Sequence, residues 1–490
     1  MADVDTRTRA EVTGRALLLA AIPPIVLALL VRIWVAHTSL LALNSDETLV
    51  GLQAREAMDG TFYLMVAGND YGSTTESYLL IPFLLAGGGA WPLRLLAGLL
   101  WAVVAFLLYR TARPLIGPAA AAVVGVIALS VSGAILVVTS RPYMGYPTGM
   151  IAMVGVLALA GRAMHDDSRL PWIAGLAGLA TGFAVWSHPM FGVVCVLALL
   201  PPTLRHWRRL LGWALPGAIG AVVGVSPWLV YIQQRGLPAA ARSSGDTTYL
   251  DRLVGFFVAL LPRAFGLRLP RGEWLWGEAV TPVVAGVIVV AAVTGWIVLL
   301  RRCGSAAAPV VFAGVAAFPV LATFGQLEFV DDARYALPFL PMLLVGLGGW
   351  LAVLPQRWGS SAWSVTVVPT AWVLLFCVPI LVRQAGWAPE NPDRAPIAAV
   401  RALEDRGVTF LRGDYWAIYL MDYLADGSLV VRPDFPIRLL GPAADVEAAD
   451  PAEVALVYGA GAEPSLLLPA ADYEILSVGG YDLYLPPGVR

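Results

Sequence analysis

The stretch ALLLAAIPPIVLALLVRIWVAH, residues 16–37, is almost entirely apolar and ends shortly before Asn44-Ser45-Asp46-Glu47. Its length is enough for a helix to cross a bilayer. It is too long for the apolar core of a signal peptide and has no convincing cleavage site, so we expect a retained membrane helix. Asp46 and Glu47 then stand where the chain leaves the bilayer, a place where ionisable groups usually face water, a partner or a reaction.

Ten further apolar runs follow, and most of them are also long enough to span a membrane. Only 13% of the residues are charged, against about 25% in a soluble domain. The sequence therefore predicts a polytopic α-helical membrane protein with about eleven transmembrane helices. The short segment 77–90, which ends in glycines, is interpreted as an interfacial or re-entrant helix. The ten runs are 91–112, 115–138, 146–164, 171–187, 189–203, 210–232, 279–300, 307–325, 335–354 and 362–382.

Arginine placement predicts the topology, because short cytoplasmic loops carry an excess of basic residues. The N-terminus and alternate short loops are arginine-rich and should be cytoplasmic. The loop that follows Asn44, the loop around Arg141, the 233–278 loop and the C-terminus should then be extracytoplasmic. The arginines concerned are Arg7, Arg9, Arg15, Arg110, Arg113, Arg162, Arg169, Arg205, Arg208, Arg209, Arg301, Arg302 and Arg357.

Two domains are predicted: a transmembrane domain, 1–385, with outer loops 45–90 and 233–278, and an extracytoplasmic domain, 386–490. Amphipathic patterns after residue 45 and at 249–265 predict helices that lie on the outer surface. After residue 386 the composition changes, and a polar helix is followed by short strand-like runs, which indicates a small α/β domain. The helix is expected at 396–406 and the strands at 408–411, 429–432, 454–458 and 481–485.

The composition also limits the chemistry. The net charge of −2 gives no indication of a nucleic-acid partner. The sequence contains no lysine, so arginine is the strong cation available for phosphates. Cys195, Cys303 and Cys377 are widely separated and favour buried thiols over a disulfide framework or a zinc site. No ligand spacing supports a metal, although acids from the two outer loops would suit a divalent ion if the fold brought them together.

Asp46 and Glu47 have a structural as well as a catalytic interpretation. Ser45 is a good N-cap and acids in the first turn favour the helix dipole, but Thr48 stands where a capping box would require Glu or Gln. Adjacent helical residues point about 100° apart. The two carboxylates should therefore not share one proton, and one of them should face the reaction while the other caps the helix or orients a substrate.

Three other polar segments lie on the predicted outer side. The segment from Asp70 to Tyr78 is rich in hydroxyls and suits carbohydrate binding. The alternative is a solvated loop in which Ser73 or Thr75 caps the following helix. Arg141 lies on the outer side, against the usual preference of arginines for the cytoplasmic side. It would suit binding of a lipid-linked phosphate, or it could be a side chain that snorkels to lipid headgroups. Arg334 and Tyr335 stand at the start of a span, where Asp331 and Asp332 offer a purely structural charge contact. His188 is isolated and interpreted as structural.

These segments, in this order, resemble a family of polyprenyl-phosphate-sugar-dependent glycosyltransferases with the GT-C fold. The family includes protein O-mannosyltransferases and the aminoarabinose transferase of lipid A, and the resemblance is to a loosely characterised bacterial branch. It rests on an acidic pair after the first span and on four later segments that cover most of the chain. These are Tyr71 to Leu79, Arg141 to Pro147, Ala333 to Pro338 and Asp414 to Leu420.

The resemblance implies a membrane-bound transferase of hexosyl or pentosyl groups that inverts the anomeric centre in one displacement. The acceptor would be a protein, a lipid or a cell-envelope glycan on the extracytoplasmic side. Asp46 would be the catalytic base, with Glu47 as its helper. The donor phosphate would be bound by Arg141, Arg334 and Tyr335. The sugar or the acceptor would be bound by Tyr71, Glu76, Tyr78 and Tyr146.

Two other classes of function remain open at this point. A transporter or flippase of lipid-linked sugars predicts charges within the spans and repeated halves, whereas here the charges cluster at span ends and no repeat is evident. A non-catalytic scaffold would instead use the 386–490 domain to bind a partner.

Overall fold

The computed structural model describes residues 2–69, 71–236, 247–270, 272–323, 332–353, 362–388 and 391–489, and of residues 2–13 and residue 210 it describes the backbone alone. Several sequence predictions therefore fall outside the described residues. These are Asp70, part of the 233–278 loop (237–246 and 271), Asp331 and Arg357, together with the side chains of Arg7 and Arg9.

The chain divides into two compact units. The helical unit contains Met1–Val35, Gly98–Thr139 and Pro147–Trp387, and the mixed unit contains Ala36–Ala97, Ser140–Tyr146 and Ala388–Arg490. This grouping joins the loop after the first span to the C-terminal segment, and so it differs from the division at residue 385 that the sequence suggests.

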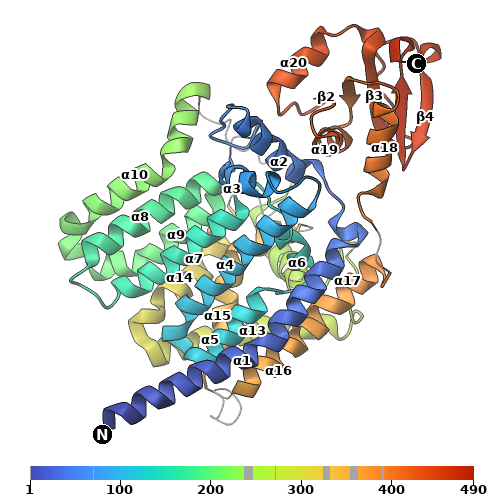
Figure 1. Cartoon of the computed structure of the whole chain (residues 1–490). Helices are drawn as coiled ribbons and strands as arrows, with labels where there is room; N and C mark the ends of the chain where they lie inside the picture. Colours follow the sequence, from blue (N-terminus) through green and yellow to red (C-terminus); the bar gives the residue numbers. More distant parts are fainter. Residues whose placement is uncertain are drawn as a thin grey trace. The chain divides into compact units, whose positions relative to one another are not determined.

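Apolar helices make up the helical unit, and each of the eleven predicted runs coincides largely with helix over its described residues (Figure 1). Among the described residues, eight helices are long and apolar enough to cross a membrane, or nine if α5 and α6, bent by 72°, form one broken span. The helices are α1 (Ala2–Ala36), α4 (Trp91–Ile116), α5 (Pro118–Ala128), α6 (Gly133–Thr139), α7 (Tyr146–Ala163), α8 (Leu170–Ser187), α9 (Pro189–Arg205), α10 (Leu210–Arg235), α11 (Tyr249–Gly255), α12 (Leu261–Ala264), α13 (Thr281–Cys303), α14 (Ala308–Leu321), α15 (Leu340–Leu351), α16 (Ala362–Trp372) and α17 (Val378–Ala385).

Small residues bring the helices close together. Glycines on α8 and α10 face the backbone of the partner helix, and they recur four residues apart, at 178 and 182 and at 220 and 224. A Cβ on Gly178 would overlap the carbonyl oxygen of Gly217, and a Cβ on Gly220 would overlap that of Gly175. Such small-xxx-small faces are typical of helix pairs in membranes, where packing rather than the hydrophobic effect drives association. Figure 1 shows α8, α9 and α10 side by side.

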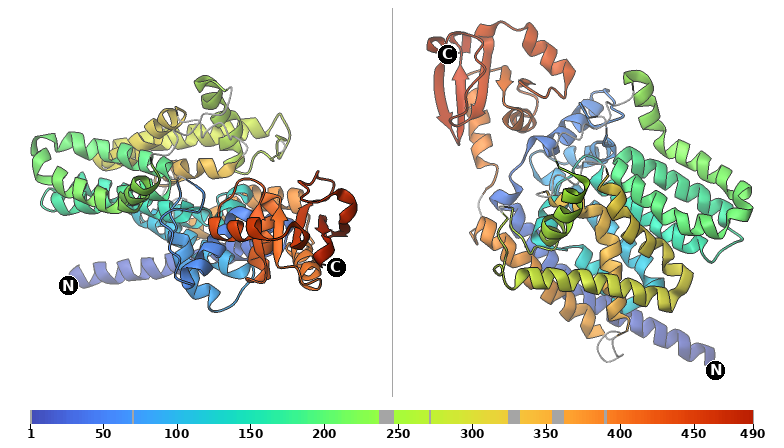
Figure 2. Two further views of the ribbon diagram at one scale, coloured as in Figure 1. Left: turned by 90° about the horizontal axis from the view of Figure 1, so that it is seen from above. Right: turned by 180° about the vertical axis from the view of Figure 1, so that it is seen from behind.

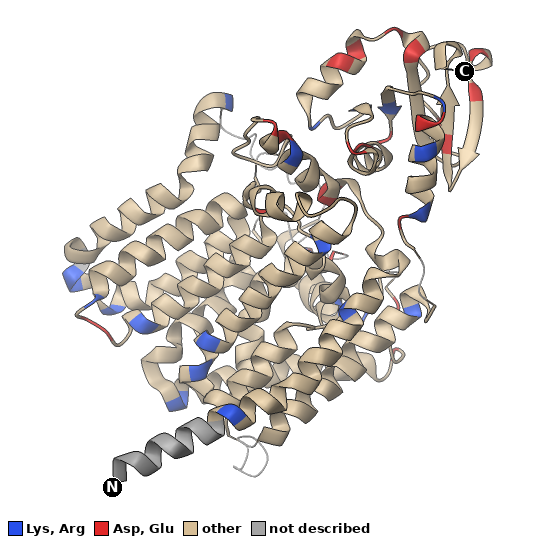
Figure 3. Ribbon diagram, in the orientation of Figure 1, with Lys and Arg blue, Asp and Glu red and all other residues tan. Residues whose placement is uncertain are grey.

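Arginines gather at one end of the helical unit (Figure 3). Arg113, Arg162, Arg205 and the Arg301–Arg302 pair all lie in the last turns of their helices α4, α7, α9 and α13. This is the pattern on which the predicted topology depends.

The mixed unit contains α2 (Ser45–Met58), α3 (Thr75–Leu84), the start of α4 and a five-stranded sheet with its helices (Figure 2). At ten residues, α3 would be only about 15 Å long, too short to cross a bilayer. The remaining elements are α18 (Arg394–Glu404), β1 (Phe410–Gly413), α19 (Tyr415–Ala425), β2 (Val430–Pro433), α20 (Leu440–Ala448), β3 (Val454–Gly459), β4 (Glu474–Val478) and β5 (Tyr481–Leu485).

The strand order is β2-β1-β3-β5-β4. β1 pairs in parallel with β2 and β3, with Leu411 opposite both Val431 and Ala455, while β5 pairs antiparallel with β3 and β4. α19 packs on β1, β2 and β3 and also contacts α2. A Cβ on Gly51 would overlap the ring of Tyr423, so the glycine permits the close approach of α2 to α19. The sheet thus supports the helix that carries the acidic pair.

Candidate active site

The first turn of α2 is held by a complete capping box. The Asn44 side chain accepts a hydrogen bond from the Glu47 backbone N–H, and the Asn44 N–H donates to Glu47 Oε1, each at 3.1 Å. The prediction of Ser45 as N-cap was wrong by one residue. Asn caps a helix as well as Ser does, and with Asn44 as the cap the third helical position falls on Glu47 rather than Thr48. The Ser45 hydroxyl instead donates to the Tyr415 carbonyl at 2.6 Å.

The two acids of this turn point into different environments, as their helical spacing predicts. The Glu47 side chain is 0% exposed, whereas Asp46 is half-buried. The Tyr415 hydroxyl donates a hydrogen bond of 2.9 Å to Asp46 Oδ1. Asp46 is therefore partly accessible to solvent and held in orientation, while Glu47 belongs to the interior.

Glu47 forms a buried ion pair with Arg141, whose Nη1 contacts Glu47 Oε1. Arg141 Nη2 also donates to the Leu40 carbonyl at 2.9 Å, and its side chain is only 8% exposed. Burial raises the pKa of the Glu47 carboxyl, and the Arg141 and Arg94 guanidiniums oppose that rise. The pair ties the segment 140–146 to the start of α2.

A second layer of polar groups surrounds this pair. Arg94 donates to the Leu41 carbonyl, and Asp393 accepts a 2.8 Å hydrogen bond from the Leu43 N–H. The Asn44 side-chain amide donates to the Tyr143 hydroxyl at 3.4 Å. The backbone that leads into α2 is thus held by charged side chains from three separate parts of the sequence.

Tyr415 is the group that fixes Asp46. Burial and the nearby Asp46 carboxylate both raise the pKa of the Tyr415 phenol, so it stays protonated and donates. The Arg438 guanidinium lies 5.7 Å from the centre of the Tyr415 ring. Arg438 also contacts the Gly68 carbonyl and the Asn69 side chain, so it connects the segment before Tyr71 to α19.

The predicted sugar-binding segment divides into exposed and buried residues. Tyr71 is 38% exposed, Tyr78 is half-buried, and Glu76 and Tyr146 are buried. The Tyr78 hydroxyl donates to the Tyr63 carbonyl and accepts from the Tyr63 N–H.

The alternative capping role for Ser73 or Thr75 was wrong. Thr74 is the residue at the N-cap of α3, and its hydroxyl donates to the Tyr63 carbonyl at 2.7 Å instead of to the helix.

Arg334 and Tyr335 lie in the helical unit. The Asp332 carboxylate accepts a 3.0 Å hydrogen bond from the Arg334 N–H and pairs with its guanidinium at 2.6 Å, so the predicted charge contact is confirmed for Asp332. The guanidinium also lies 5.4 Å from the centre of the Tyr335 ring. His188 is buried and caps α9 by accepting from the Met190 N–H.

Within the described ranges, no three His, Cys, Asp or Glu side chains gather closely enough to hold a metal ion. Cys195 and Cys377 are buried and Cys303 is half-buried, all as free thiols.

Four residues of the site were missed by sequence reasoning: Arg94, Asp393, Tyr415 and Arg438. Arg94 could have been found by the criterion that identified Arg141, because it too is an arginine at the predicted outer end of a span. Tyr415 lies in the segment Asp414 to Leu420, for which the resemblance implies no role. Asp393 and Arg438 had no local signal, since the bonds of Asp393 to Leu43 and of Arg438 to Gly68 join residues more than 340 positions apart.

No known family model matches the chain, and no curated protein sequence matches it. Two solved structures of ArnT from Cupriavidus metallidurans match 94% of this chain and 97% of their own length, with 14% sequence identity. The TM-score is 0.65 for the apo state and 0.61 for the state bound to undecaprenyl phosphate. An Archaeoglobus fulgidus oligosaccharyltransferase complex with Zn and sulfate matches 84% of this chain and 62% of its own, with 13% identity and a TM-score of 0.46, too low to carry an argument.

The likeness to ArnT extends over nearly the whole of both chains, and a five-stranded sheet is present in the C-terminal part of this one. The predicted GT-C-like fold is thereby confirmed: this chain has the fold of ArnT.

Proposed function

We propose that this protein is an inverting glycosyltransferase that moves a sugar from a polyprenyl-phosphate donor to an extracytoplasmic acceptor. The observation that carries the proposal is the environment of Asp46: a half-buried carboxylate in the first turn of α2, oriented by the Tyr415 hydroxyl at 2.9 Å. The fold of an ArnT that binds undecaprenyl phosphate supports a polyprenyl-phosphate donor.

In the proposed reaction, Asp46 accepts the proton of the acceptor hydroxyl or amine. The acceptor oxygen or nitrogen forms a bond to the anomeric carbon as the bond from that carbon to the phosphate oxygen breaks, and polyprenyl phosphate leaves with the electron pair. A single displacement inverts the anomeric centre. A base must reach the acceptor proton within about 2.6–3.2 Å. Asp46 suits this role because its carboxylate is only half-buried.

Glu47 has a different role in this proposal. Its carboxylate is fully buried, and its contacts are Arg141 and the cap of its own helix. We therefore assign it to positioning: it fixes the first turn of α2, and with it the direction of Asp46.

The cations are assigned by their accessibility. Arg334, with 24% of its side chain exposed and Tyr335 beside it, is proposed to bind the donor phosphate. Arg141 is more buried and occupied by Glu47 and Leu40, so it contributes to phosphate binding only if it shares its guanidinium protons with the phosphate. Arginine suits this task because its planar fork matches phosphate oxygens.

The aromatic and acidic residues before and within α3 are proposed to bind the sugar or acceptor. Tyr71, at 38% exposure, offers a ring for contact with a sugar face. Tyr78, Glu76 and Tyr146 are more buried, and we propose that they support the residues that contact the sugar or acceptor.

We further propose that the mixed unit faces the extracytoplasmic side of a bacterial plasma membrane. The arginine-rich ends of α4, α7, α9 and α13 support this orientation, because basic residues mark the cytoplasmic side. Cysteines placed at exposed Asp59 and Arg169 test it. An impermeant maleimide added to whole cells should label the first and spare the second; the reverse pattern would contradict the orientation.

The function is tested with purified protein and a synthetic polyprenyl-phosphate sugar, offered in turn to peptide, lipid and glycan acceptors. The expected products are polyprenyl phosphate and a glycoside of opposite anomeric configuration, identified by NMR. Release of the free sugar alone, or a product that retains configuration, would contradict the proposal.

A further inference from the structure

A cavity of about 1490 Å³ lies within the helical unit, at the arginine-rich end of α4 and α7 and the start of α8. This volume exceeds the range of about 300–1,000 Å³ that is usual for small-molecule pockets. The site proposed above uses none of the residues that line it.

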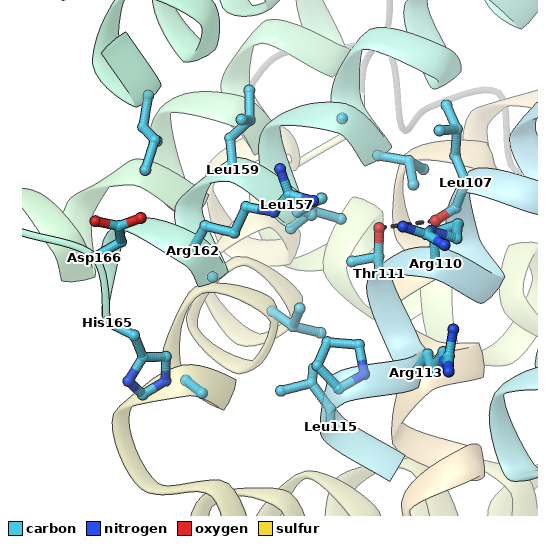
Figure 4. A pocket seen from close by; sticks show the side chains of 18 of the residues that line it. Leu107, Arg110, Thr111, Arg113, Leu115, Leu157, Leu159, Arg162, His165 and Asp166 are labelled. Carbon is cyan, nitrogen blue, oxygen red and sulfur yellow. Dashed lines mark hydrogen bonds between the residues drawn. The ribbon is translucent and has the colours of Figure 1, made fainter. Parts of the chain in front are cut away.

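Four guanidiniums line this cavity, those of Arg110, Arg113, Arg162 and Arg169. Figure 4 shows the Arg162 side chain reaching from α7 toward α4, which carries Arg110 and Arg113. Asp166 is the one acid among the lining residues, and it pairs with Arg169 at 3.8 Å. In the described part of the chain, Arg110, Arg113 and Arg162 have no ion-pair partner, so the cavity has a strong excess of positive charge.

Apart from Thr111 and His165, the remaining wall is apolar. Leu157 and Ile173 are buried at its inner surface, while Phe106, Leu176 and Trp172 are 59%, 39% and 71% exposed. These three exposed side chains belong to α4 and α8, which are both long enough to cross a bilayer. A ligand that fills this cavity therefore needs an anionic head for the arginines and apolar chains for the wall.

We propose that this cavity binds an anionic phospholipid of the membrane leaflet in which the arginine-rich helix ends lie. The lipid phosphate would contact Arg110, Arg113 and Arg162, and its acyl chains would lie along Phe106, Trp172 and Leu176. Basic pockets between membrane helices are suited to such headgroups. The apolar wall is the reason to choose a lipid over a soluble phosphate, which would leave most of the cavity surface unused.

Purified protein is examined by native mass spectrometry with phosphatidylglycerol, and with phosphatidylcholine as the zwitterionic comparison. Wild-type protein should retain phosphatidylglycerol in preference to phosphatidylcholine. Each arginine near a membrane surface is worth about 1 kcal/mol toward anionic lipid. The double variant R110Q/R162Q should therefore bind phosphatidylglycerol about 30-fold more weakly. Arg301→Gln, an exposed arginine at the end of α13 outside this cavity, should bind like wild type.

A second variant separates a cavity from a mere patch of charge. Gly155 on α7 lines the cavity, and a Cβ added there meets nothing within 4 Å. Gly155→Leu should therefore fill the apolar part without disturbing the fold, and should weaken phosphatidylglycerol binding with all four arginines present.

Three results would overturn the proposal. They are wild-type affinity for phosphatidylglycerol in R110Q/R162Q, wild-type affinity in Gly155→Leu, or a loss of affinity in Arg301→Gln as large as that in R110Q/R162Q. Inorganic phosphate supplies the remaining test. If it displaces phosphatidylglycerol at comparable concentration, the site belongs to a soluble anion and the lipid assignment is wrong.

Discussion

Replacing Arg141 by methionine should destabilise the mixed unit in a strongly pH-dependent way. Glu47 is fully buried and would lose its ion-pair partner. The carboxylate would then have only the Arg94 guanidinium to compensate it, and it can avoid this buried charge by taking up a proton. From an ordinary pKa of 4.5, that costs about 1.36 kcal/mol per pH unit, or about 3.4 kcal/mol at pH 7 and about 0.7 kcal/mol at pH 5.

The higher figure matches the roughly 3–5 kcal/mol that is typical when one partner of a buried pair is removed. It is an upper value here, because burial already raises the pKa of Glu47 in the native chain and part of the cost is present in the wild type.

The assay is reversible unfolding in mixed detergent micelles at pH 5 and pH 7, followed by tryptophan fluorescence. The double variant Glu47→Gln/Arg141→Met should recover most of the loss. Gln is neutral and can replace Glu in the capping box. Arg401→Met is the matched control, because Arg401 is an exposed arginine of the same unit with no ion-pair partner among the described residues. It should change stability by less than about 0.5 kcal/mol.

Two results would refute this reasoning. A loss in Arg141→Met that is the same at both pH values would mean that Glu47 does not take up the proton. Additive losses in the double variant would mean that the two side chains are not coupled.

Three further predictions follow from the same structure. Burial raises the pKa of Asp422 to about 7, so its protonated form favours the folded state, and its contribution to stability should be lost as the pH rises from about 4 to about 7. Unfolding measured across that range should show a smaller fall in stability for Asp422→Asn than for wild type, whereas the exposed Asp426→Asn should show the wild-type fall. Tyr415→Phe removes the hydrogen bond to Asp46. Because hydrogen bonds to charged groups are worth about 1.5–3 kcal/mol, kcat should fall about ten-fold or more with little change in KM. An unchanged kcat would mean that Tyr415 does not act on Asp46 in the reaction. Arg334→Gln should raise KM for the polyprenyl-phosphate donor more than it lowers kcat, and an unaffected donor KM would exclude the assigned phosphate contact.

Much of the fold follows from periodicity in the sequence. The apolar runs are long and their boundaries carry Pro, Gly or Arg, so each predicted run coincides largely with helix where the structure describes it. The strands β1, β2, β3 and β5 lie within two residues of the predicted positions. β4 was missed because it is an edge strand with no buried residue, which left no apolar alternation to detect.

The candidate site was only partly predictable. Asp46 and Glu47 could be separated by helical geometry, because two adjacent residues cannot share one face. Which of the two is buried could not be predicted, since the answer depends on Arg141, 94 positions away, and on Tyr415, 369 positions away. Contacts of that range are set by tertiary packing and leave no local pattern.

The central claim, that Asp46 is the catalytic base, is tested most directly by single-turnover sugar transfer with Asp46→Asn. A polyprenyl-phosphate sugar is the donor, and Asp59→Asn, an exposed acid at the other end of α2, is the control. Loss of a general base costs about 10²–10⁴-fold in rate. The account predicts such a loss in Asp46→Asn, with wild-type folding and a wild-type rate in Asp59→Asn. A full rate of transfer by Asp46→Asn would contradict it.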